Sequence, residues 1–262
     1  MFSERPLDGE LSTVRETHAS GAVVLNAETD FETLEPAVAE QLGLRADALS
    51  PLTYDPAWVP PDAPEVLSRL AADEFTVGAP GDGGVVWTRQ TEPPFVLVKP
   101  RVAGSPEGFV DFLVAMALVE AGTELPEQFL GFFRAEYREL ADATPLDPAD
   151  TYQLANALYD AYVGLHTRET FVSWADDHPQ LHEQFVDAGD RLRPRLADLS
   201  GEVARGETSF AAAAELACSA VRHATPDGPS VPAPFSALDT SAYRHHGPEY
   251  AVQWAEKTFE KL

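Results

Sequence analysis

The chain has 262 residues, with 43 acidic and 18 basic side chains and a formal net charge of −25. Hydrophobic residues make up 44% of it, which is too high for a disordered chain. A single cysteine cannot form an internal disulfide framework or a cysteine-rich zinc site. The acidic balance argues against a nucleic-acid partner, because such binding requires cationic groups that displace phosphate counterions.

Membrane insertion is not expected either. The longest unbroken apolar run, Phe112–Val119, is far shorter than the ~20 residues that cross a bilayer. The first residues, MFSERPLDGE, are charged and lack the apolar core of a signal peptide. We therefore expect a soluble, cytoplasmic protein without a membrane partner.

The basic residues are strongly skewed, with 15 arginines against three lysines, and isoleucine is absent. A domain this acidic repels itself in dilute buffer, whereas at molar salt the Debye length falls to ~3 Å and the repulsion is screened. The composition resembles that of haloarchaeal proteins and predicts adaptation to concentrated salt. The alternative is an ordinary acidic protein of a mesophile.

The first 104 residues alternate short apolar runs with turn signals, a pattern typical of short strands and helices. Helices are expected at Phe31–Leu42, with Asp30 as N-cap, and at Pro64–Ala72. Strands are expected at Ala22–Asn26, Phe75–Gly78, Val85–Arg89 and Phe95–Lys99. Because only short turns separate the last three strands, they predict a small antiparallel meander.

Helical signals dominate from Ser105 onward. Ser105 is a candidate N-cap, Pro106 suits the first helical position, and the helix is expected to end at Gly122. Further helices are expected at 126–141, 148–168, 179–197, 208–224 and 248–261.

We therefore predict an α+β fold in a single domain, 1–262. A sheet-bearing part, 1–104, contains a small antiparallel or mixed sheet, and a predominantly helical part, 105–262, covers it. The 106–121 helix should be central and largely buried.

The segment Phe95–Gly122, FVLVKPRVAGSPEGFVDFLVAMALVEAG, resembles the strand-then-helix unit of zincin metallopeptidases, whose helix carries H-E-x-x-H. Met116 stands at the first histidine position, Ala117 at the glutamate and Glu120 at the second histidine. A thioether is a poor zinc ligand and alanine cannot move a proton. The resemblance thus implies a degenerate zincin-like scaffold without metal or other cofactor. The alternative is an ordinary buried helix.

The whole chain also resembles an uncharacterised haloarchaeal protein family. The resemblance lies in the phrases PEQFLGFF (126–133), ATPLDPADTY (143–152) and AELACSAV (214–221). It implies no activity.

One of the three lysines of the chain, Lys99, lies shortly before the 106–121 helix. Lys99 and Arg101 lie between a strand end and a helix N-terminus, where backbone N–H groups can hold an anion. This pattern predicts a ligand-binding site for an anion or carboxylate, with Arg89, Lys99, Arg101, Ser105 and Glu120 as candidates. The alternative is that these cations pair with surface carboxylates.

Two histidines are weak candidates for a metal site. His178 and His182 have the i,i+4 spacing that lets two side chains share a metal ion. However, Pro179 places His178 at a helix cap, before regular helical geometry begins. No residue is assigned a catalytic role.

Aromatic residues form a stripe on the C-terminal helix at Tyr250, Trp254 and Phe259. The stripe predicts a surface for an unknown protein partner or for a homo-oligomer. The alternative is docking on the protein's own core.

Two hypotheses for function follow. The first is a non-catalytic binding or interaction protein, since no catalytic motif is intact. The alternative is a hydrolase in which Lys99 and Arg101 hold an anionic substrate. Its site would be assembled from Glu120, His178, His182, His245 and His246.

Overall fold

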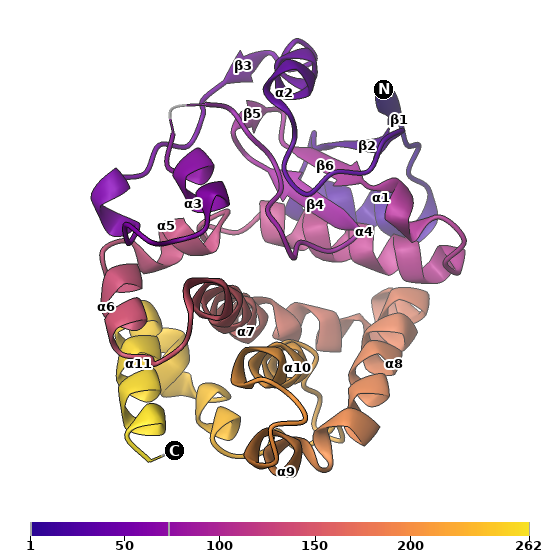
Figure 1. Cartoon of the computed structure of the whole chain (residues 1–262). Coiled ribbons are helices and arrows are strands. Elements are labelled where there is room, and N and C mark those ends of the chain that lie inside the picture. The colour runs from indigo at the N-terminus through magenta and orange to yellow at the C-terminus, as the bar shows by residue number, and fades with distance from the viewer. Residues whose placement is uncertain (1, 73, 262) are drawn as a thin grey trace. The chain divides into compact units, whose positions relative to one another are not determined.

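The computed structural model describes residues 2–72 and 74–261, with a small mixed sheet in the N-terminal part and helices in most of the rest (Figure 1). This confirms the α+β class. The chain divides into two compact units. Unit 1 comprises Met1–Tyr54 and Ser68–Glu127, and unit 2 comprises Asp55–Leu67 and Gln128–Leu262. The single-domain organisation stays a prediction.

Unit 1 contains a four-stranded sheet in the order β1-β2-β6-β4. Its strands are β1 (Phe2–Glu4), β2 (Val23–Ala27), β4 (Val85–Thr88) and β6 (Phe95–Val98). The central pair, β2 and β6, is parallel, while β1 and β4 pair antiparallel at the two edges. A separate antiparallel ribbon pairs β3 (Ala48–Leu49) with β5 (Thr91–Glu92).

The expected meander is therefore only partly present. β4 and β6 do pair antiparallel, but β6 has β2 as its other neighbour. Residues 75–78 do not form the expected strand. Val77 is buried in the core and its carbonyl accepts a hydrogen bond from the Leu34 N–H, while Gly78 turns the chain at φ 84°. Burial of Val77, and not strand pairing, accounts for the apolar pattern.

Helices cover both faces of the sheet (Figure 1). Leu25 and Leu97 point to the face where α2 (Pro36–Gly43) packs. On the other face lie α1 (Gly9–His18) and α4 (Glu107–Ala121), which contact each other. Ten residues of α4 are buried, which confirms that this helix is largely buried.

Two expected helix caps are wrong. The helix after Asp30 begins only at Pro36, with Glu35 as N-cap, and the Asp30 carboxylate binds Arg101. Pro106, and not Ser105, is the N-cap of α4, and no side chain hydrogen-bonds to the first turn. A short 3-10 helix, η2 (Pro100–Val102), links β6 to α4.

Unit 2 is helical. Its described elements are η1 (Pro56–Trp58), α5 (Phe129–Phe133), α6 (Glu136–Asp142), α7 (Pro148–Asp177), α8 (Pro179–Leu196), α9 (Leu199–Ala204), α10 (Phe210–Arg222), η3 (Phe235–Leu238) and α11 (Ser241–Phe259). The short helix α3 (Glu65–Leu70) lies across the boundary of the two units. None of the described helices has both the length and the apolar character that crossing a bilayer requires.

The helices of unit 2 differ from expectation at three points. The 126–141 helix is split into α5 and α6 at Arg134, whose φ is 53°. The helix expected from 248 begins earlier, at Ser241, and is kinked at Gly247, whose φ is 50°. The helix expected at 148–168 is longer than predicted, since α7 continues to Asp177.

Candidate functional site

A pocket of about 310 Å³ lies in unit 1 at the carboxyl ends of β2 and β6. We call it the strand-end pocket. Asn26 and Val98, which face each other in the parallel register, contribute to it. Its polar lining residues are Arg5, Asn26, Lys99, Ser105 and Glu107.

The topology of unit 1 creates this pocket. The chain leaves β2 toward α2 on one face of the sheet, and it leaves β6 through η2 toward α4 on the other face (Figure 1). Connections that diverge from adjacent parallel strands leave a crevice outside their carboxyl ends, where α/β proteins commonly bind ligands. The strand-end pocket occupies this position.

The first turn of α4 contributes Glu107 and Val110 to the pocket wall, with Ser105 immediately before it. Because the N-cap residue Pro106 offers no capping side chain, the positive end of the helix is not neutralised by a cap. Arg5 is fixed at the pocket by a 2.9 Å hydrogen bond from its Nη2 to Oδ1 of Asp111 on α4. The pocket thus combines a helix N-terminus with a positioned guanidinium.

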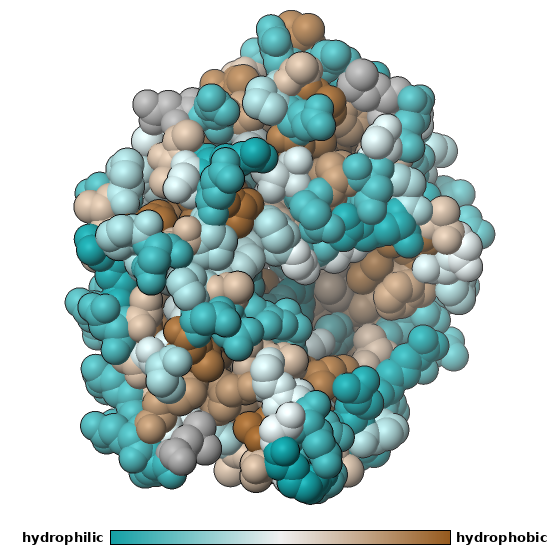
Figure 2. All heavy atoms as spheres, in the orientation of Figure 1, coloured by the Kyte–Doolittle hydropathy of each residue, from teal (hydrophilic) through white to brown (hydrophobic). Residues whose placement is uncertain are grey.

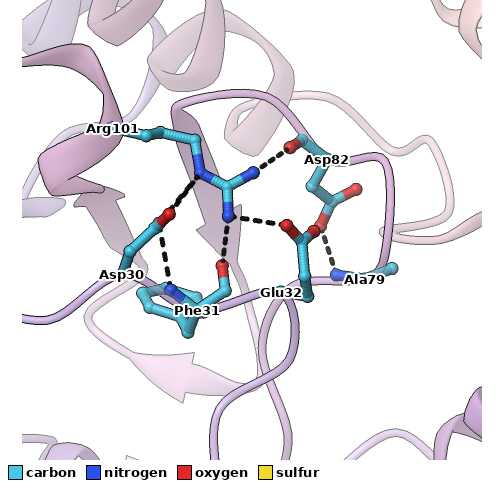
Figure 3. A network of polar contacts seen from close by, with 6 residues as sticks. All are labelled: Asp30, Phe31, Glu32, Ala79, Asp82 and Arg101. Atoms are coloured by element: carbon cyan, nitrogen blue, oxygen red, sulfur yellow. Dashed lines mark hydrogen bonds and ion pairs between the residues drawn. The ribbon is translucent and has the colours of Figure 1, made fainter.

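Arg101 does not line the pocket, and its guanidinium instead binds acidic side chains and backbone carbonyls of neighbouring segments (Figure 3). Its Nε donates to Asp30 Oδ1 at 2.8 Å, and its Nη2 donates to Glu32 Oε1 at 2.7 Å. The guanidinium also binds the backbone carbonyls of Phe31 and Asp82. The hydrogen bond from Arg101 lowers the pKa of Asp30.

We call Asp30, Glu32, Asp82, Lys99 and Arg101 the charge cluster. Asp82 lies in the glycine-rich turn before β4, where its carboxylate accepts a hydrogen bond from the Ala79 N–H. Burial raises the pKa of Asp82 to about 6, although the neighbouring Lys99 ammonium opposes this shift.

Lys99 is fully buried, and its Nζ lies 4.7 Å from the centre of the Phe31 ring. Within the described residues, the Nζ has no hydrogen-bond partner. Burial lowers the pKa of Lys99, and the negative charge of Asp82 partly offsets that effect. Lys99 belongs to the wall of the pocket, while its ammonium lies against Phe31.

The structure places two predicted site residues elsewhere. Arg89 lies over the Trp87 ring and donates to the carbonyls of Thr123 and Leu125, beyond the C-terminal end of α4. The Glu120 carboxylate accepts a 3.0 Å hydrogen bond from the Trp87 indole. Of the five predicted ligand-site residues, Lys99 and Ser105 therefore line the strand-end pocket, and Arg101 lies behind its wall.

Arg5 and Asn26 were missed because their roles depend on tertiary structure. Asn26 ends the apolar run that forms β2, and a polar residue at that position is the one local signal that could have found it. Arg5 reaches the pocket because β1 pairs with β2, and no motif in the N-terminal sequence indicates that pairing.

A buried carboxylate, Glu127, was also missed. It accepts hydrogen bonds from the Arg89 backbone N–H at 2.9 Å and from Gln90 Nε2 at 2.8 Å. Burial raises the pKa of Glu127 to about 7. The group lies at the end of unit 1, and its contacts fix the segment that follows α4.

The four candidate histidines, His178, His182, His245 and His246, lie in unit 2. His182 Nδ1 is 3.1 Å from the Phe171 carbonyl, and the His178 ring packs edge-on against Trp174 at the α7–α8 junction. His245 and His246 are exposed on α11, where His245 Nδ1 lies 2.6 Å from the Ser241 carbonyl. Across residues 2–72 and 74–261, no group of three or more metal-ligating side chains could hold an ion.

The aromatic stripe of α11 contacts its own unit. Tyr250 donates to the Ala237 carbonyl at 2.9 Å, and the Trp254 indole donates to the Pro234 carbonyl at 3.1 Å. The Phe259 ring lies 4.7 Å from that of Phe210. These contacts correspond to docking on the core, while a role in partner binding stays a prediction.

Comparison with protein families gives one match, which covers residues 1–262 and is described as a family of unknown function, DUF7089. The chain belongs to this family. Neither the curated proteins nor the solved structures gave a match to it. The match is consistent with the expected uncharacterised family, and it assigns no chemistry to the strand-end pocket.

Proposed function

We propose that this DUF7089 protein is a non-catalytic binding protein that holds a small carboxylate or oxyanion in the strand-end pocket. The observation that carries the proposal is a crevice at the carboxyl ends of two parallel strands that meets the uncapped N-terminus of α4. Helix N-termini present backbone N–H groups and a positive potential to anions.

The size and polarity of the pocket support this ligand class. A volume of about 310 Å³ is at the lower end of small-molecule sites, which run from roughly 300 to 1,000 Å³. Arg5 supplies a cation, Asn26 an amide and Ser105 a hydroxyl, the groups that orient a carboxylate. The Glu107 carboxylate lies at the same wall and would repel a ligand anion placed close to it. The pocket therefore favours an anion small enough to bind at a distance from Glu107.

The residues of α4 at the zincin positions support a scaffolding role for this helix. Met116 and Ala117 are buried in the core, and the Glu120 carboxylate is engaged by Trp87. We therefore propose that α4 acts by presenting its N-terminus to the ligand, on a zincin-like scaffold that has lost its metal chemistry.

Calorimetric titration with pyruvate, a small carboxylate, tests the proposal. The informative variant is Ser105→Asp, because a carboxylate just before the N-cap should be attracted to the positive end of α4 and repel the anion from it. We expect this variant to melt at the same or a higher temperature while losing pyruvate binding. Ser68→Asp, an exposed position in unit 1, adds the same charge away from the pocket and should bind normally.

Two results would count against anion binding. One is wild-type protein that binds neither pyruvate nor sulfate. The other is a Ser105→Asp variant that binds pyruvate as tightly as the Ser68→Asp control, since the ligand would then lie elsewhere.

We further propose that the protein works in the cytoplasm of a salt-accumulating cell. The net charge of −25 with only three lysines supports this environment. Figure 2 shows hydrophilic residues over much of the visible face. Leu44 and Leu49 are the exposed large hydrophobic residues among those the structure describes. A polar, acidic surface of this kind is suited to high ionic strength, where its self-repulsion is screened.

A further inference from the structure

The short helix η2 lies between the strand-end pocket and the carboxylates of the charge cluster, while Lys99 of that cluster also belongs to the pocket wall. Pro100 and Val102 of η2 line the pocket, while Arg101, between them in sequence, binds Asp30 and Glu32. Gly84, which ends the turn containing Asp82, packs so closely on Val102 that an added Cβ would collide with its side chain. The turn that carries Asp82 and one wall of the pocket are therefore in direct contact.

The charge cluster can exist in two charge states. Its carboxylates are Asp30, Glu32 and Asp82, and its cations are Lys99 and Arg101. With all three carboxylates ionised, the net charge of the cluster is −1. When Asp82 holds a proton, the cluster is neutral, because two cations then balance two carboxylates.

We propose that proton binding at Asp82 controls anion affinity in the strand-end pocket, the neutral cluster favouring the bound anion and the negative cluster disfavouring it. This inference rests on the proposed function, since it concerns regulation of the same pocket. Its physical basis is the repulsion between a ligand anion and the extra negative charge behind the η2 wall. Because Asp82 is partly shielded from solvent, salt screens this repulsion less than it screens surface charges.

The direction and pH range follow from Asp82. Its pKa is about 6, so the cluster is neutral below that pH and negative above it. The charged groups that act on Asp82 are Lys99 from the end of β6, Arg101 from η2 and Glu32 from the segment before α2. Anion affinity should therefore fall as the pH rises from 5 to 7.5.

Sulfate is a suitable probe, because its charge does not change over this pH range. At constant ionic strength, we expect its dissociation constant to rise by roughly three- to tenfold between pH 5 and 7.5, as expected for two partly buried charges. Asp82→Asn, which mimics the protonated carboxyl, should bind sulfate at every pH as wild type does at pH 5. Glu127→Gln removes a second carboxyl whose pKa is raised into this range, outside the pocket, and should keep the wild-type pH dependence.

A reciprocal measurement does not depend on how the variants fold. Linkage requires saturating sulfate to raise the pKa of Asp82 by the logarithm of the same affinity ratio, which carboxyl carbon NMR of wild-type protein measures. A pH-independent sulfate affinity, an unchanged slope in Asp82→Asn, or an Asp82 pKa insensitive to sulfate would overturn the proton control alone. Absence of sulfate binding at every pH would overturn both this control and the proposed function.

Discussion

The ammonium of Lys99 lies 4.7 Å from the centre of the Phe31 ring, fully buried and with no hydrogen-bond partner among the described residues. The attraction between a cation and an aromatic face is worth about 0.5–2 kcal/mol. Removing an ammonium from water costs several kcal/mol unless acceptors replace its hydration. The buried charge of Lys99 therefore lowers the free energy of unfolding.

Replacing Lys99 with methionine should stabilise the protein at neutral pH. Because the folded-state pKa of Lys99 is lowered, the fold disfavours the charged form, and an apolar side chain of similar length removes that cost. We expect the free energy of unfolding in urea to rise by roughly 1 kcal/mol. Lys257→Met at an exposed position serves as the control and should have little effect. A clear loss of stability in Lys99→Met would show that the ammonium supports the fold.

Glu127 should make stability decrease with pH over a defined window. Its pKa is raised from 4.5 to about 7, so between these values the folded state holds a proton that the unfolded state has released. The contribution of Glu127 to the free energy of unfolding is largest below pH 4.5. It declines as the pH rises to 7, by at most ~3 kcal/mol.

Urea unfolding of Glu127→Gln from pH 3.5 to 8 checks this decline, which the variant should lack. Asp82→Asn is the matched comparison, because it should remove only the part of the pH dependence between 3.8 and 6. A Glu127→Gln variant with the wild-type slope would refute the assignment.

Gly164 should be essential for the packing of unit 2. It lies on α7 where α10 approaches so closely that an added Cβ would overlap the backbone of Arg222. We expect Gly164→Ala to lower the free energy of unfolding by about 1–3 kcal/mol, the usual cost of overpacking. Gly83→Ala provides the control, because its Cβ would enter open space at ordinary φ. Equal stability of the two variants would contradict the close approach of the helices.

Molar salt should stabilise the protein. With a net charge of −25, screening of self-repulsion favours the folded state. We expect the melting temperature to rise between 0.1 M and 2 M KCl, and to rise less in sucrose, which does not screen charge. Equal melting temperatures at the two KCl concentrations would argue against adaptation to salt.

The fold could be predicted where a signal was local. Pro106 and Gly122 bracket α4, and the helices expected from 148 and 179 begin at those residues, as α7 and α8. The parallel pairing of β2 with β6 could not be predicted, because it joins segments about 70 residues apart and no turn connects them. Asp30 was misassigned for a similar reason, since its partner, Arg101, is remote in sequence.

The candidate site was predicted in part. Lys99 and Ser105 were found because a rare lysine precedes a helix start, and both line the strand-end pocket. Arg89 and Glu120 were grouped with them on sequence proximity, yet their partners lie around Trp87. Because β4 and β6 run antiparallel, Arg89 follows the end of β4 that pairs with the amino end of β6, whereas the pocket lies at the carboxyl end of β6. Strand direction, which the sequence alone does not determine, separates Arg89 from the pocket, and the length of α4 separates Glu120 from it.

A crystal structure of the protein soaked in selenate tests the central claim most directly, because selenium identifies this sulfate-like dianion by anomalous scattering. We expect one anomalous peak in the strand-end pocket, within hydrogen-bond distance of the first-turn N–H groups of α4 and near Arg5 and Asn26. A structure whose pocket lacks a peak, or whose selenate binds only at the exposed arginines of unit 2, would contradict the claim.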